Sequence, residues 1–149
     1  MSMEPKVKLR TLAGISAPLQ VIFGSPLFRW FDKQLPPGYI QFGTCARVMR
    51  VSTVPWDYAF SGPRTPEQLR IQIDVLDFDP VTCAAAAKAV DDFMMTVDLV
   101  NHNQFDSPPT SAQQAQNFKM NQRDGMESQL GKPAHVEILE YRVFNDQTW

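Results

Sequence analysis

The clearest hydrophobic pattern in the sequence changes its period at Asp79-Pro80. Before this point, apolar and polar residues alternate through Leu69–Val75, which predicts a half-buried strand. Asp79 supplies an N-cap acceptor, and Pro80 suits the first helical position because its missing N–H needs no intrahelical partner. Beyond it, apolar residues recur at spacings of four and three, as on one face of an amphipathic helix. They are Cys83, Ala87, Val90, Met94 and Val97.

The N-terminal part predicts helices. Val7–Phe23 is helix-prone, but Gly14 and Pro18 interrupt it, so we expect one helix to about Gly14 and a short second helix from Ala17. The expected core contacts are Val7, Leu9, Leu12, Ile15, Leu19 and Ile22.

Three further segments have the composition of long strands: Tyr39–Val51, Asn117–Asp124 and His135–Asn145. A shorter strand is expected in Leu27–Phe31, and Gly125–Pro133 is expected to turn the chain. The strand from Leu69 pairs most simply with Tyr39–Val51 as an antiparallel ribbon, in which Gly43 predicts a bulge or a close backbone approach.

These elements predict an α+β fold. It comprises an antiparallel sheet of about four main strands, with a mixed sheet as the alternative, an N-terminal helical unit and one long amphipathic helix packed on one face. The 149 residues, 44% of them hydrophobic, suit one domain over residues 1–149, with long loops at about 52–66 and 101–116.

Charge and composition narrow the expected partners and compartment. The net charge of −2 predicts no general attraction to nucleic acid or to anionic membranes. No apolar run reaches the roughly 20 residues that a membrane span needs, and no apolar export segment follows Lys6, Lys8 and Arg10. Cys45 and Cys83 have no CxxC spacing and make no disulfide framework, so a reducing, cytoplasmic compartment fits better, with a bridge between the two as the alternative.

The sequence has little that suggests catalysis. Neither Ser25 nor Ser61 has the glycines of a nucleophile elbow, and His102 and His135 are far apart and not near a cysteine. We therefore expect no catalytic residues and no cofactor. The best candidate is the acidic group Asp74, Asp77 and Asp79, which would suit a hard cation such as Mg²⁺.

The same three carboxylates have a structural explanation. Asp79 is the helix N-cap, Asp74 lies on the polar face of its strand, and Asp77 begins the connection between them.

Aromatic residues near the prolines are the best candidates for an interface. Trp56, Tyr58 and Phe60 alternate between Pro55 and Pro63, which suits either strand packing or a loop that presents apolar anchors to another protein. Base stacking is a third possibility, which the lack of a basic groove disfavours. The candidate interface residues are Trp56, Tyr58, Phe60, Phe105 and Trp149.

Several stretches together resemble the tail-completion and tail-terminator (head–tail joining) proteins of long-tailed bacteriophages. The resemblance covers most of the chain, and the order and spacing of its parts carry it more than any one motif. The loops at 52–66 and 101–116 look longer than a minimal member needs. The matching parts are the helix pair ending near Phe23-Gly24, Pro37–Gly43, Leu69–Val75 with the alanine-rich helix after it, Gln122–Asp124 and Glu137–Phe144.

This resemblance implies a structural virion protein. Such proteins form rings, commonly hexameric, at the head-proximal end of the tail tube, where they end tube polymerisation and join the tail to the head. The implied partners are further copies of the chain, the tail tube protein, a head–tail connector or stopper protein, and DNA that passes through the ring without sequence-specific binding. The implied location is the virion neck, after assembly in the host cytoplasm.

Two alternatives come from other classes of protein. One is a small metal-dependent α+β enzyme that uses Asp74, Asp77 and Asp79, and the other is a ligand-binding dimer of ferredoxin-like build.

Overall fold

The computed structural model describes residues 5–24, 29–55, 67–96 and 117–145 of the chain. Its helices and strands, in chain order, are α1 (Pro5–Ala13), α2 (Ala17–Phe23), β1 (Trp30–Asp32), the 3₁₀ helix η1 (Tyr39–Phe42), β2 (Cys45–Pro55), β3 (Glu67–Asp77), α3 (Pro80–Thr96), β4 (Asn117–Gln129) and β5 (Lys132–Asn145). They form a five-stranded sheet in the order β1-β2-β3-β5-β4. Strand β1 is parallel to β2 and the other pairs are antiparallel, so the predicted α+β fold is confirmed, with a mixed sheet.

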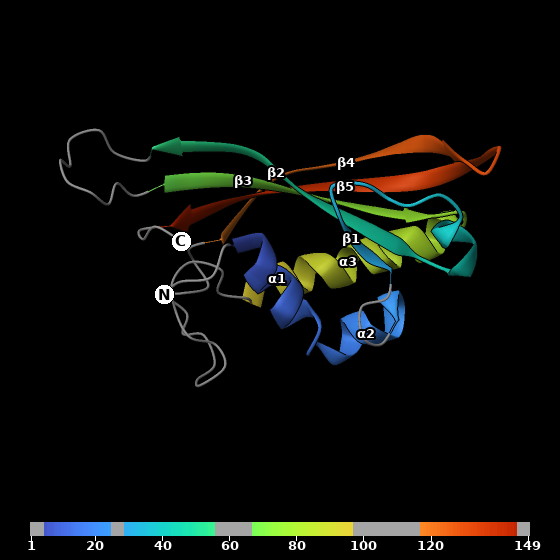
Figure 1. The fold of residues 1–149 in the computed structure, drawn as a ribbon, viewed down its shortest axis with the longest axis horizontal. Coiled ribbons are helices and arrows are strands. Elements are labelled where there is room, and N and C mark those ends of the chain that lie inside the picture. Colours follow the sequence, from blue (N-terminus) through green and yellow to red (C-terminus); the bar gives the residue numbers. More distant parts are fainter. Residues whose placement is uncertain (1–4, 25–28, 56–66, 97–116, 146–149) are drawn as a thin grey trace.

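All three helices lie on one face of the sheet (Figure 1). Because side chains alternate between the faces of a strand, Ile71 and Ile73 of β3 and Leu139 and Tyr141 of β5 point into this helical layer. All four are fully buried in the main core. The Tyr141 hydroxyl donates a hydrogen bond of 2.6 Å to Oδ1 of Asp91 on α3, which ties the helix to the sheet.

The expected apolar stripe of α3 is confirmed where the structure describes it. Cys83, Ala87, Val90 and Met94 have no exposed surface, whereas Val97 lies outside the described residues.

The two N-terminal helices also match the prediction, and most of their expected contacts are buried. Leu9, Leu12 and Leu19 are in the core and Ile22 packs at its margin; the side chain of Val7 is outside the described part of the chain. The expectation for Ile15 is wrong, because α1 ends at Ala13 and leaves Ile15 in the turn before α2, 67% exposed.

A second, smaller core lies on the opposite face of the sheet. Ile40 of η1 packs there against Cys45, Leu76, Ala134 and Val136, which alternate in register with the residues of the main core. The segment between β1 and β2 therefore covers one end of the face that carries no α-helix.

The prediction of one strand through Tyr39–Val51 is wrong in its first part. Residues Tyr39–Phe42 form η1, and β2 begins only at Cys45. Two glycines flank η1 and turn the chain at both of its ends. They have positive φ angles, 88° at Gly38 and 139° at Gly43, which glycine adopts more readily than other residues. The apolar composition of this segment reflects burial in the second core.

The chain turns within Gly125–Pro133 as predicted, but the turn is shorter than expected, because β4 continues to Gln129. The strands join through Leu130 and Gly131, whose φ angles of 54° and 74° match a two-residue hairpin turn. Conversely, Ser52–Pro55 belongs to β2, although a loop was expected from Ser52; residues 56–66 are outside the described part.

Candidate functional site

The three carboxylates of the predicted acidic group do not converge. Asp74 and Asp77 are three residues apart on one strand, so their side chains lie on opposite faces of the sheet. Asp74 is only 1% exposed and accepts hydrogen bonds from Nε of Arg47 at 2.7 Å and Nε2 of Gln72 at 2.8 Å.

Asp77 and Asp79 organise the start of α3. Asp77 accepts hydrogen bonds from the Thr44 hydroxyl at 2.5 Å and the Asp79 backbone N–H at 2.9 Å. Asp79 caps the helix by accepting from the Thr82 hydroxyl and backbone N–H, and the hydroxyl contact lowers the pKa of Asp79. Within the described ranges, no three metal-ligating side chains form a group that could hold an ion, so the structural explanation accounts for all three.

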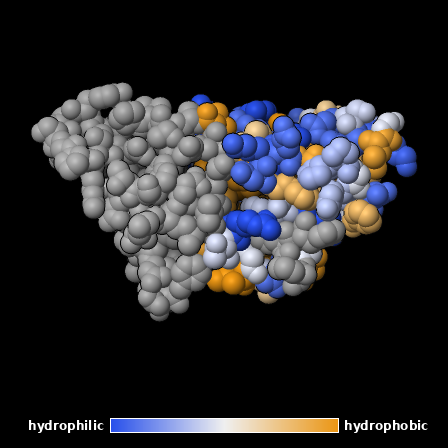
Figure 2. Space-filling view, viewed as in Figure 1, coloured by the Kyte–Doolittle hydropathy of each residue, from blue (hydrophilic) through white to orange (hydrophobic). Residues whose placement is uncertain are grey.

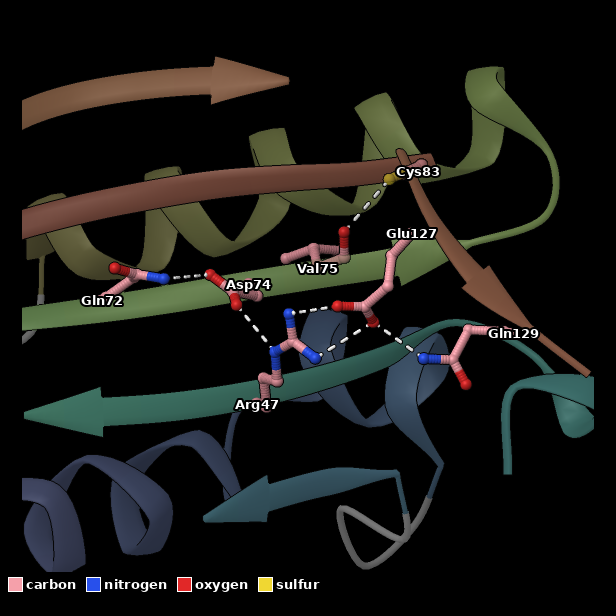
Figure 3. A network of polar contacts seen from close by, with 7 residues as sticks. All are labelled: Arg47, Gln72, Asp74, Val75, Cys83, Glu127 and Gln129. Carbon is pink, nitrogen blue, oxygen red and sulfur yellow. Dashed lines mark hydrogen bonds and ion pairs between the residues drawn. The ribbon is translucent and has the colours of Figure 1, made fainter. Parts of the chain in front are cut away.

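A polar network crosses the face of the sheet opposite the helices (Figure 3). We call Arg47, Asp74 and Glu127 the Arg47 network. The Arg47 guanidinium, which binds Asp74 through Nε, also donates from Nη1 and Nη2 to the two Glu127 oxygens at 3.1 and 3.0 Å. Gln129 adds a hydrogen bond of 2.7 Å to Glu127. These contacts, above all the bonds from Arg47, lower the pKa of the Glu127 carboxyl.

The Arg47 network bridges strands that are not neighbours. Arg47 is on β2 and Glu127 on β4, with β3 and β5 between them in the sheet order. Figure 3 shows the end of β4 running obliquely across the sheet, so that the Glu127 side chain points back toward β2. The network therefore fixes the β4–β5 hairpin in a strongly twisted position over this face.

A second carboxylate on the same face links the other strands. Glu140 of β5, 8% exposed, accepts one hydrogen bond of 2.8 Å from Arg123 of β4 and another of 2.8 Å from Arg70 of β3. These bonds, with the contact from Arg123 the larger, lower the pKa of Glu140. The acidic groups of this face are thus neutralised by arginines, and their role is to hold strands together.

Among the described residues, large apolar side chains are exposed at several places, and two of these are the β4–β5 turn region and a hollow beside α2. Met126 and Leu130, 62% and 53% exposed, form what we call the hairpin tip of β4–β5. In Figure 2, apolar patches lie at the right-hand end of the molecule, where Figure 1 places this turn.

The other feature is a surface hollow of about 380 Å³ between α2 and α3, which we call the α2–α3 hollow. Its walls are Val21 and Ile22 of α2 and Ala85 and Ala86 of α3, and Val21 is 84% exposed at its rim. Thr44, Asp77 and Thr82 supply polar atoms, together with Arg29 and Gly43.

The interface residues predicted from the sequence, Trp56, Tyr58, Phe60, Phe105 and Trp149, all lie outside the described residues. No pattern in the sequence predicts the hairpin tip, the α2–α3 hollow or the Arg47 network. A signal for the tip was available, since Met126 and Leu130 interrupt an otherwise polar run; the network has no local signal, because its partners are 80 residues apart.

None of the described helices is long and apolar enough to cross a membrane.

Comparison with known proteins shows similarity at the level of fold. No family model matches the sequence, and no curated protein matches it either. Among solved structures, the chain is similar to one in a structure described as "Virion of native gene transfer agent (GTA) particle". The TM-score is 0.55 at 18% sequence identity, and the similarity covers 94% of this chain and 90% of the other. The chain therefore shares its fold, over nearly its whole length, with a chain of a virus-like particle.

Proposed function

We propose that this protein is a structural component of a phage-type virion, and that it acts as a tail terminator or head–tail joining protein. Copies of the chain form a homo-oligomeric ring at the head-proximal end of the tail tube. The resemblance of the sequence to tail-terminator proteins favours six copies in this ring. The ring ends tube polymerisation and offers its other side to the head connector.

The fold similarity to a chain of the gene transfer agent particle carries the proposal. It extends over 94% of this chain and 90% of the other, so it involves the whole architecture and not one common motif. It agrees with the tail-terminator resemblance of the sequence, which rests on separate evidence.

The polar residues support a structural role. The three carboxylates that suggested a metal-dependent enzyme are engaged in a helix cap, a strand-end contact and the Arg47 network. The ferredoxin-like alternative is disfavoured by the element order, since α3 is the only α-helix between strands among the described elements, whereas the βαββαβ build has two such helices.

Particle composition and tail length test the proposal directly. In the phage-type particle that encodes this chain, we expect the protein in purified particles, detectable by mass spectrometry at a few copies relative to the tube protein. Deleting its gene should give tubes of uncontrolled length that lack heads, and complementation with the wild-type gene should restore uniform joined tails.

Assembly state provides the second measurement. Light scattering after size exclusion and native mass spectrometry are expected to show a closed oligomer, with six copies as the specific expectation. A protein that remains monomeric at high concentration and is missing from particles would contradict the proposal.

A further inference from the structure

Strand β4 forms one edge of the sheet. It is last in the strand order, and among the described residues it pairs only with β5. The strand at the other edge, β1, has three residues, whereas β4 has 13 and contains no proline. Edge strands that are neither short nor interrupted by proline can pair with a strand of another chain. Since the bulge of β4 lies near its start, at Met120, the stretch Asn121–Gln129 is a regular edge.

Pro133 shows which residues of β4 turn their backbone groups away from β5. In an antiparallel pair, opposite residues either exchange two hydrogen bonds or direct their N–H and C=O groups away from each other. Pro133 lies opposite Ser128 and has no N–H, so this pair is of the second kind. Because the two kinds alternate, Gln122, Asp124 and Met126 also direct their backbone groups outward.

The side chains of the other residues form a self-complementary row. They lie with Glu127 on the face of the sheet that carries no α-helix, in the order Asn121, Arg123, Gly125, Glu127 and Gln129. If a second copy of β4 lies antiparallel to the first about a two-fold axis at Gly125, Arg123 is opposite Glu127 of the second copy. Asn121 is then opposite Gln129, so charge meets opposite charge and amide meets amide.

Neighbouring registers lack this match. A two-fold axis at Arg123, Asp124 or Glu127 would place that residue opposite its own copy, and like charges directly opposite each other are destabilising. An axis at Met126 would place Arg123 opposite Gln129 and would pair no opposite charges. In the Gly125 register, the outward backbone groups of Asp124 also meet those of Met126, as a hydrogen-bonded ladder requires.

Arg123 and Glu127 have surface available for this contact, although each already has a partner within the chain. The side chain of Arg123, bonded to Glu140, is 49% exposed, and that of Glu127, bonded to Arg47, is 34% exposed. A guanidinium has five donors, and a carboxylate accepts more than two hydrogen bonds. At the centre of the contact, nothing lies within 4 Å of a Cβ added to Gly125.

We propose that β4 of one copy pairs with β4 of a second copy about a two-fold axis at Gly125, which joins the two sheets into one. The contact uses the same patch on both copies and closes at two, so it is additional to the contacts that would form the proposed ring. The inference therefore does not rest on the proposed function. Because the paired strands are polar and their ion pairs exposed, the contact is weak and depends on concentration.

A single cysteine tests the two-fold axis directly. Gly125→Cys places two thiols on opposite residues whose Cα atoms are about 4.5 Å apart, which is within the range of a disulfide. Mild oxidation is expected to give linked dimers on non-reducing electrophoresis. Asn121→Cys is the matched control, since it is exposed on the same strand but lies opposite Gln129, and it should link at least about tenfold more slowly. Cys45 and Cys83 are buried and do not interfere.

Proline at position 124 tests the hydrogen bonds of the edge. Asp124→Pro removes an outward N–H and leaves the bonds between β4 and β5 in place. In the Gly125→Cys background it should slow linking by about tenfold or more, because the two-fold contact loses two hydrogen bonds. Asp124→Ala in the same background removes the carboxylate alone and should link like the parent.

The charges of the row are tested separately. In the Gly125→Cys background, Arg123→Gln removes one charge of each intermolecular pair, while Arg70 still binds Glu140. Linking should become slower by about fivefold, since two exposed ion pairs are lost. A high salt concentration should slow the parent in the same way and should have little effect on the Arg123→Gln variant.

The outcomes separate this contact from the proposed function. Equal linking of Gly125→Cys and Asn121→Cys would overturn the pairing, as would linking that neither Asp124→Pro nor Arg123→Gln slows. Thermal melting close to that of the parent shows that a variant remains folded. Overturning the pairing leaves the proposed function intact, because particle composition tests it. A chain that links through position 125 but is absent from particles supports the pairing and contradicts the proposed function alone.

Discussion

Arg47 on β2 donates two hydrogen bonds to Glu127 on β4, at 3.1 and 3.0 Å, although two other strands separate them in the sheet order. A pair this far apart in the sheet can meet only because the β4–β5 hairpin twists over the face that carries no α-helix. The pair therefore connects the position of the hairpin tip to the centre of the fold.

Glu127→Gln is expected to loosen the hairpin without unfolding the protein. The amide loses the charge-assisted pair to Arg47, and because Glu127 is partly exposed, we expect a loss of about 1 kcal/mol in the free energy of unfolding. Urea unfolding gives the change, and amide hydrogen exchange should show reduced protection confined to the hairpin. Lys88→Met, which removes an exposed pair with Asp92, is the control and should change stability by less than about 0.5 kcal/mol.

Arg47→Met is expected to lower the free energy of unfolding by more, about 3 kcal/mol. The substitution leaves the Asp74 carboxylate buried, with the hydrogen bond from Gln72 in place of the two that it now accepts. The double variant Arg47→Met/Asp74→Asn should regain part of this loss, because it removes the buried charge. Equal stability of the single and double variants in urea unfolding would show that the burial of Asp74 is not the cause.

Acid is expected to weaken the face of the sheet that carries these networks. Arginine contacts hold the pKa values of Glu127 and Glu140 below the ordinary value of about 4.3. A carboxyl whose pKa is lower in the folded state stabilises the protein at pH values above its pKa in the unfolded state. This stabilisation is lost as the pH falls through the pKa of the folded state. As the pH is lowered from about 4.3, the melting temperature should therefore decrease. The decrease should be less steep in the double variant Glu127→Gln/Glu140→Gln than in the wild type.

Gly43→Ala is expected to destabilise the junction between η1 and β2. Its φ of 139° is unfavourable for alanine, and an added Cβ would lie 3.0 Å from Nη2 of Arg29. That guanidinium donates hydrogen bonds of 2.8 Å to the carbonyls of Thr44 and Ile22. We therefore expect Gly43→Ala to lower the free energy of unfolding by about 2 kcal/mol. Gly125→Ala is the matched control, because nothing lies within 4 Å of its added Cβ. Similar melting temperatures for the two variants would contradict this explanation.

The two thiols are expected to be unreactive in the folded protein. Burial raises the pKa of Cys45 and of Cys83 to about 11, so little thiolate exists near neutral pH. The Cys83 thiol also donates to the carbonyl of Val75 at 3.3 Å. Labelling with iodoacetamide at pH 7.5 should therefore be slow in buffer and complete for both cysteines in urea. Rapid labelling of the folded protein would show that its core opens readily.

The sequence predicts those parts of the fold that depend on local rules. The strand from Leu69, the cap at Asp79 and the buried stripe from Cys83 each follow from residues within a few positions of one another. The break between α1 and α2 follows in the same way from Gly14 and Pro18.

The parts that the sequence does not predict depend on distant contacts. The segment Tyr39–Phe42 has the composition of a strand. Its apolar residues can be buried against Leu76 and Val136 equally well from a 3₁₀ helix. The Arg47 network requires the twist of a hairpin whose two strands give no indication of its direction. The hairpin tip and the α2–α3 hollow are surface features, and periodicity describes only what is buried.

The Arg47 network also limits how the length of this hairpin can vary. Side chains alternate along β4, so one residue inserted between the bulge and Glu127 would turn Glu127 toward the helices and leave Arg47 without its partner. The strand already contains one extra residue, Met120, at a bulge between Lys119 and Asn121, where the register shifts well before the turn. Each residue also advances a strand by about 3.3 Å, so two inserted residues would carry Glu127 past Arg47. Related chains that retain the network are therefore expected to vary the length of this hairpin beyond Glu127, on the side of the turn.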